Sequence, residues 1–181
     1  PNPNTSTPGL AFLMANIGEL GEQQTFNWWA KMRANGVKVT RSWSDAYYTE
    51  FTQNGGARPL VVSYATSPAA EVQFGKGKYS TPPTGHLFLK GGVFRQIEGA
   101  AVLRNSKQPA LAAKLVQYLQ SPTVQQSVPT EMWGYPAVNN TPLPKIFEFA
   151  QAPSQYFSPS AQHIATEQRA WVGRWTRITL K

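Results

Sequence analysis

The sequence predicts an α/β fold, because short helical patterns alternate along the chain with short apolar runs that suit buried strands. The 181 residues are 41% hydrophobic and 12% aromatic, and a chain of this length can bury a substantial core. No window approaches the roughly 18 consecutive apolar residues of a membrane span. In α/β proteins ligands usually bind at the carboxyl ends of the strands, so binding residues are expected just after them.

Two helices are predicted near the N-terminus. Apolar residues recur at helical spacing over residues 8–20, and Pro8 suits the first turn of a helix, where a missing N–H costs nothing. Thr7 is therefore the expected N-cap. A second helix is expected over residues 26–34, because an Asn-Gly pair follows as a stop signal.

Three strand regions are predicted between and after these helices. Residues 37–40 alternate as a strand does, residues 59–64 form an apolar run of the length of a buried central strand, and residues 93–104 supply one or two more. A further helix is expected to begin at Ser44 and to end at a Gly-rich stop over residues 54–56.

The second half of the chain predicts helices after Pro109 and Ser121, then a proline-rich irregular connection over residues 129–159 that marks a boundary. Residues 160–180 carry an apolar stripe at helical spacing, which has to pack on something. The stripe consists of Ile164, Trp171, Trp175 and Ile178.

Composition argues against most catalytic chemistry. The chain has no cysteine, its two histidines (His86 and His163) are isolated in sequence, and no hydrolase, NTPase or dinucleotide motif occurs. We therefore predict no catalytic residue, metal site or cofactor. The net charge is +8, but the basic residues are dispersed, so nucleic acid is not predicted as a partner.

The stretch TSTPGL has two interpretations, as an anion-binding helix start or as an ordinary helix cap. Ser6 and Thr7, the free N–H groups of a helix start and a glycine that lets a ligand approach would suit a phosphate or sulfate. Ser/Thr-Pro is also an ordinary helix start without any ligand.

Aromatic residues stand beside hydroxyl residues at the predicted loop positions. They are Trp43, Tyr64, Trp133 and Tyr135. Aromatic faces bind cations and flat heterocycles, so these residues are candidates for a ligand cleft; the alternative is that they close the core.

The stretches NTSTPGL, SWSDAYY, VVSYATSP, QIEGAAVLRNSKQPALAAKLVQYLQSP and PTEMWGYPAVNNTPLP together resemble the second half of the thiamine-binding periplasmic proteins. These are the substrate-binding components of bacterial ABC transporters. The resemblance runs in order from about Asn2 to the terminal RAWVGRWTR.

The resemblance implies a non-catalytic periplasmic or extracytoplasmic protein with a type II periplasmic binding protein fold, in which two α/β lobes close on the ligand. Residues 1–135 would form the second lobe, and the first would precede Pro1. Residues 136–181 would form a proline-rich connection and a C-terminal helix that packs on the first lobe. The stripe would then cover that lobe, its own lobe or another chain. The implied partners are a thiamine-type molecule and a membrane permease.

The resemblance also implies roles for the candidate site residues. Ser6 would hydrogen-bond the phosphate of a thiamine phosphate or the hydroxyethyl end of thiamine, and Trp43 would join it there. Tyr64 and Trp133 would line the ring pocket, with Trp133 stacking on the heterocycle. The sequence departs from the family at Ala70, where a second stacking tyrosine is common.

Two alternatives remain open at this point. Tyr47 and Tyr48 are adjacent, like the paired phenolates of related ferric-binding proteins, and phenolate oxygen suits a hard cation. Their position inside a predicted helix argues against a shared ion, because neighbours there face about 100° apart. A basic nucleic-acid or adaptor module that stacks through exposed aromatics is the alternative of another class.

Overall fold

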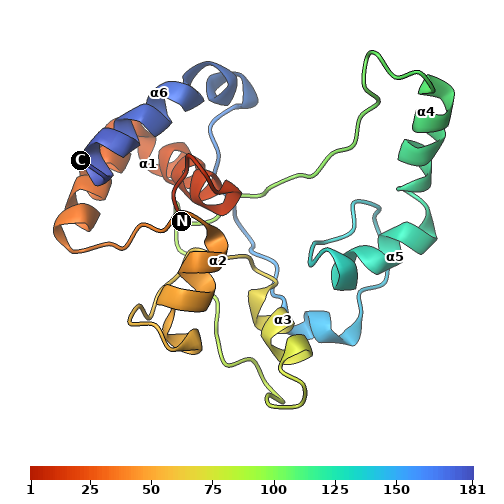
Figure 1. Ribbon diagram of the computed structural model, residues 1–181, viewed down its shortest axis with the longest axis horizontal. Helices are drawn as coiled ribbons and strands as arrows, with labels where there is room; N and C mark the ends of the chain where they lie inside the picture. The colour runs from red at the N-terminus through yellow and green to blue at the C-terminus, as the bar shows by residue number, and fades with distance from the viewer. The chain divides into compact units, whose positions relative to one another are not determined.

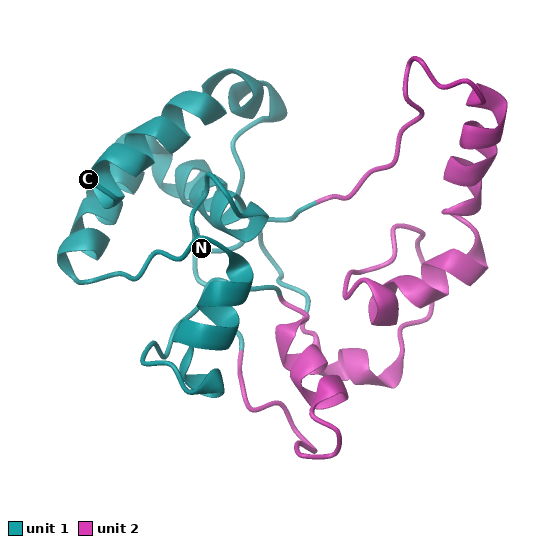
Figure 2. Ribbon diagram, in the orientation of Figure 1, with its two compact units in different colours: residues 1–64, 86–96, 152–181 teal, residues 65–85, 97–151 magenta.

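The computed structural model describes residues 1–181, which divide into two compact units (Figure 2). Unit 1 comprises residues 1–64, 86–96 and 152–181, and unit 2 comprises residues 65–85 and 97–151. None of the helices combines the length and the apolar character that crossing a membrane demands.

The first helix of unit 1, α1, spans Thr7–Ala34 and contains both predicted N-terminal helices (Figure 1). They are separated at Gly21, whose φ of 73° and ψ of 166° interrupt the helical backbone. The N-cap is Ser6 and not Thr7. The prediction was wrong by one residue because Pro8 fits the second helical position as well as the first, since neither N–H is used within the helix.

The last helix, α6, spans Ala161–Thr179 and packs against α1. Ser160 begins it, because its hydroxyl accepts a hydrogen bond from the His163 N–H at 3.2 Å. Trp171 and Trp175 of the predicted stripe are buried, so the stripe covers a helix of its own chain. The buried apolar cluster of unit 1 consists of Leu13, Met14, Ile17, Phe26, Trp29, Trp171 and Trp175.

A short helical segment follows the first predicted strand region. It comprises α2 (Trp43–Asp45), the π-helical turn η1 (Ala46–Glu50) and the 3-10 turn η2 (Thr52–Asn54). The N-cap of this segment is Ser42, two residues before the predicted start at Ser44, because Ser42 and Asp45 form a capping box. Each side chain accepts a hydrogen bond from the other residue's N–H, at 3.0 and 3.3 Å.

The predicted strands do not form, so the α/β class is not confirmed. Residues 37–40, 59–64 and 93–104 run as irregular chain, and the only β-type pairing is an isolated bridge between Phe51 and Arg58. A strand is stable only when a ladder of hydrogen bonds joins it to a neighbour. Here the contacts are single, such as the bond from the Phe157 N–H to the Val93 carbonyl at 2.8 Å.

Unit 2 contains α3 (Ser67–Phe74), α4 (Pro109–Tyr118), α5 (Pro122–Glu131) and the 3-10 helix η3 (Lys145–Phe149). The predictions of α4 and α5 are confirmed, although α5 continues through Pro129 into the segment predicted as irregular. The prediction missed α3. The core of unit 2 contains Ala69 of α3 and Phe147 of η3, and α3 packs on η3. The division at residue 135 stays a prediction.

Candidate functional site

The helix start at Ser6 is available for a polar contact. Ser6 is half-buried and its side chain makes no capping hydrogen bond, while Thr7 is exposed. Gly9, expected to let a ligand approach, is instead buried under the backbone of Pro1 and Asn2, with which an added Cβ would collide. Its small size therefore accommodates the chain's own first residues.

Backbone contacts hold this helix start beside the segment that leads to Trp43. The Asn2 N–H donates to the Thr40 carbonyl at 2.9 Å, and the Thr5 hydroxyl donates to the Arg41 carbonyl at 2.5 Å. Thr5 is the first of the three hydroxyl residues in TSTPGL, but no pattern in the sequence marks it as a connecting residue. The stretches that carry Ser6 and Trp43 are thus tied together within unit 1.

Trp43 lies at the centre of an aromatic cluster in unit 1. We define this cluster as Trp43, Tyr47, Tyr48 and Tyr64. Trp43 is half-buried and stacks on Tyr47, with ring centroids 5.0 Å apart and an interplanar angle of 26°. Its ring centroid lies 5.5 Å from that of Tyr64, which is 45% exposed, and 5.6 Å from that of Tyr48. The structure therefore brings the predicted residues Trp43 and Tyr64 together.

Ser63, which is not among the residues predicted for the site, also contacts this cluster. Its hydroxyl oxygen accepts a hydrogen bond from the Trp43 indole N–H at 3.0 Å. Nothing in its sequence position distinguishes Ser63 except that it precedes Tyr64 at the end of an apolar run. The partner twenty residues away becomes visible only in the folded chain.

Trp133 and Tyr135 belong to unit 2. Trp133 has a left-handed backbone (φ 54°) and stacks on Phe147 at 6.2 Å and 17°. The Tyr135 hydroxyl donates to the Ala150 carbonyl at 2.8 Å, and burial raises the pKa of this phenol. Both rings therefore contact other side chains or backbone of unit 2. A left-handed conformation in a bulky residue is strained and is more common at functional positions.

The adjacent tyrosines occupy different environments. Tyr47 is 4% exposed, Tyr48 is 59% exposed, and their rings meet edge to face with centroids 5.3 Å apart. Both rings contact Trp43. This arrangement does not favour the ferric alternative, because a pair of phenolates on one ion needs both oxygens at the same surface.

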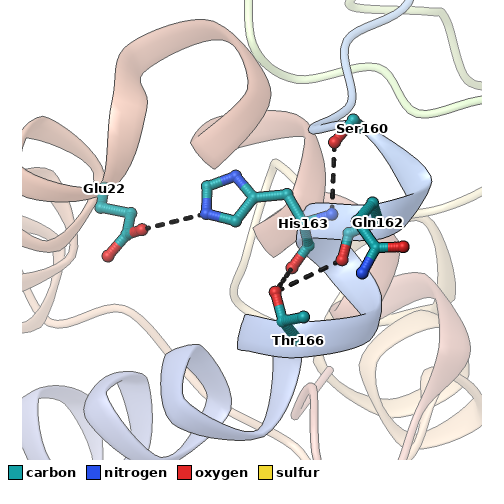
Figure 3. Close-up of polar contacts among 5 residues, drawn as sticks. All are labelled: Glu22, Ser160, Gln162, His163 and Thr166. Carbon is teal, nitrogen blue, oxygen red and sulfur yellow. Dashed lines mark hydrogen bonds and ion pairs between the residues drawn. The ribbon is translucent and has the colours of Figure 1, made fainter.

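The remaining titratable groups include no candidate metal site. No group of three or more His, Asp or Glu side chains is placed to hold a metal ion. His163 joins α6 to α1 through Glu22, with 3.7 Å between Nε2 and Oε1 (Figure 3). In the same helical turn the Thr166 hydroxyl lies at hydrogen-bonding distance from the Gln162 and His163 carbonyls, at 3.3 and 3.2 Å (Figure 3). These contacts are those of a helix terminus packed on its neighbour.

Comparisons with known proteins place this chain in a family of bacterial solute-binding proteins. Residues 1–153 match the family model described as "Bacterial extracellular solute-binding protein". The chain is similar to the thiamine-binding periplasmic proteins of Escherichia coli strain K12 and Salmonella typhimurium, with 35% identity to each over 97% of this chain and 51% of each relative. Identity to the thiamine-binding periplasmic protein of Brucella melitensis is 31%, over 98% of this chain and 51% of the relative.

The chain therefore spans about half the length of these curated relatives. No solved structure gives a significant match.

Proposed function

Because this chain belongs to the bacterial extracellular solute-binding protein family, we propose that it is the ligand-binding half of a thiamine receptor that serves an ABC importer. The observation that carries the proposal is its 35% identity, over 97% of its length, to proteins named as thiamine-binding. The receptor works outside the cytoplasm, binds its ligand without chemical change and delivers it to a membrane permease.

The aromatic cluster of unit 1 supports a ligand of this kind. Thiamine carries a positively charged ring and a second flat heterocycle. Aromatic faces attract such groups, with about 0.5–2 kcal/mol for each cation–π contact, depending on desolvation. Trp43 and Tyr64 are adjacent and only partly buried, so their rings are accessible from solvent.

Ser6 and Thr7 would bind the polar end of the ligand, and Trp43 would join them. The Ser6 hydroxyl makes no capping bond, and the N-terminus of a long helix favours negative charge. Thiamine phosphates therefore fit this end better than thiamine does. Trp133 would stack on the heterocycle, with Tyr135 beside it.

The family also supports a type II periplasmic binding fold for the complete receptor. In it, residues 1–135 form one lobe, while residues 136–181 form the connection and the C-terminal helix. The pocket closes when the two lobes meet, and closure excludes water from the ligand.

The proposal is tested by titrating the full-length protein with thiamine, thiamine phosphate and thiamine diphosphate while recording tryptophan fluorescence. A saturable response at micromolar concentration of at least one of the three is expected, because Trp43 lies in the aromatic cluster of unit 1 that would contact the ligand. Ferric citrate and a single-stranded oligonucleotide at about 0.2 M salt serve as comparison ligands. A response to either of these, without one to any thiamine compound, would refute the assignment.

Replacing Ser6 with Ala tests the polar end of the site. A hydrogen bond to a charged group contributes about 1.5–3 kcal/mol and a neutral one about 0.5–1.5 kcal/mol. Ser6→Ala should therefore weaken thiamine phosphate about 10- to 100-fold and thiamine about 3- to 10-fold. Ser154→Ala, at an exposed serine of unit 1, is the matched control and should leave both affinities unchanged. Equal losses for the two ligands would assign Ser6 a purely structural role.

A further inference from the structure

Ser63 contacts the aromatic cluster through the indole N–H of Trp43, the central residue of the cluster. The Trp43 indole has a single hydrogen-bond donor, and that N–H points at the Ser63 hydroxyl oxygen at 3.0 Å. Both side chains are half-buried, so the bond is partly shielded from water. The contact joins the helical segment at residue 43 to the end of the irregular segment over residues 59–64.

Two different restraints act on the Trp43 ring. Tyr47 is 4% exposed and stacks on the indole at 5.0 Å and 26°, which fixes the plane of the ring. A stack is only weakly directional, so by itself it tolerates modest rotations about χ1 and χ2 of Trp43. The bond to Ser63 removes this freedom, because it fixes the direction of the N–H.

Ser63 also couples two residues of the proposed pocket. It immediately precedes Tyr64, whose ring centroid lies 5.5 Å from that of Trp43 at an angle of 60°. The hydrogen bond therefore holds the backbone that carries Tyr64 beside Trp43, and it also restricts the orientation of the Trp43 ring.

We infer that Ser63 is a positioning residue, which holds the Trp43 indole in the orientation it presents beside Tyr64. The effect of Ser63 on ligand affinity rests on the proposed function, whereas its effect on Trp43 does not. A side chain that is ordered before binding spares the ligand the cost of ordering it, and this corresponds to about 3- to 10-fold in affinity.

The first test uses the ligand-free full-length protein. The indole N–H resonance of Trp43 is assigned in a nitrogen–proton correlation spectrum by its loss in Trp43→Phe. Ser63→Ala should shift this resonance to the position of an indole without a protein partner. Ser63→Thr keeps a hydroxyl group and should keep the resonance in place. Ser44→Ala is the matched control, because Ser44 is exposed and adjoins Trp43 without bonding its indole. An unmoved Trp43 resonance in Ser63→Ala overturns the inference.

The second test measures binding of thiamine and thiamine phosphate. Ser63→Ala should weaken both about 3- to 10-fold, and Ser63→Thr should restore most of the affinity. Wild-type affinity in Ser63→Ala, or an equal loss in Ser63→Thr, overturns the positioning role. If the resonance shifts as expected but the wild-type protein binds no thiamine compound, the proposed function fails while the restraint of Ser63 on Trp43 is supported.

Discussion

Thr25 in α1 has 0% exposure, and its hydroxyl makes no hydrogen bond. Valine has nearly the same shape as threonine and a similar helix propensity, so Thr25→Val exchanges this hydroxyl for a methyl group and changes little else. Burying a hydroxyl without a partner costs about 1–3 kcal/mol. Thr25→Val should therefore raise the free energy of unfolding of unit 1 by about 1–3 kcal/mol.

Urea unfolding followed by tryptophan fluorescence measures this change. The signal reports mainly on unit 1, because four of the six tryptophans lie in or against its core: Trp28, Trp29, Trp171 and Trp175. With a urea dependence of about 2 kcal/mol per M, a gain of about 2 kcal/mol moves the midpoint up by about 1 M.

Thr176→Val is the matched control, with the opposite expected sign. The Thr176 hydroxyl donates to the Val172 carbonyl at 2.8 Å and accepts from the Asn4 side-chain amide at 2.9 Å. Its removal should lower the free energy of unfolding by about 1 kcal/mol. An unchanged or lowered stability of Thr25→Val would refute the reasoning, because it would mean that the Thr25 hydroxyl is satisfied in the folded protein.

Two further changes test the backbone of α1 and the phenol of unit 2. Gly21→Ala should destabilise the protein in urea unfolding by about 1–3 kcal/mol, because the backbone angles φ 73° and ψ 166° are almost confined to glycine. Gly173→Ala, inside α6, is the control and should be neutral or stabilising by up to about 1 kcal/mol. Tyr135→Phe should cost about 1 kcal/mol at neutral pH through the lost bond to Ala150. Burial raises the pKa of Tyr135, so the contribution of this phenol to the free energy of unfolding is fully present below its ordinary pKa of 10.0. This contribution is lost as the pH rises through the raised pKa. Unfolding curves recorded from about pH 8 to 11 should show the loss in the wild type and less of it in Tyr135→Phe.

The helices of this chain were largely predictable because their signals are local. Ser121 and Ser160 stand where α5 and α6 begin, and each hydroxyl accepts a bond from an N–H three residues later. Such caps and the helical spacing of apolar residues act within one or two turns. The errors at Thr7 and Ser44 were one or two residues, which is the range over which neighbouring hydroxyl residues compete for the cap position.

The candidate site was predictable only in part. Trp43 and Tyr64 were recognised because aromatic residues stood after predicted strands, and the structure places them side by side. Ser63 was missed, since a serine in an apolar run carries no sign of its distant partner. The glycine at position 9 predicts space for a ligand to approach, but in the structure the backbone of residues 1 and 2 fills that space.

The sequence alone therefore determined most of the helices, the apolar stripe that α6 buries and the resemblance to thiamine-binding proteins. Tertiary structure decided that the stripe packs on α1, that Ser63 bonds Trp43 and that the segments predicted as strands form no sheet. The physical reason is the range of the interactions. A helix satisfies its backbone within four residues, whereas a strand, a buried aromatic ring or an indole N–H is satisfied by whatever distant segment the fold brings to it.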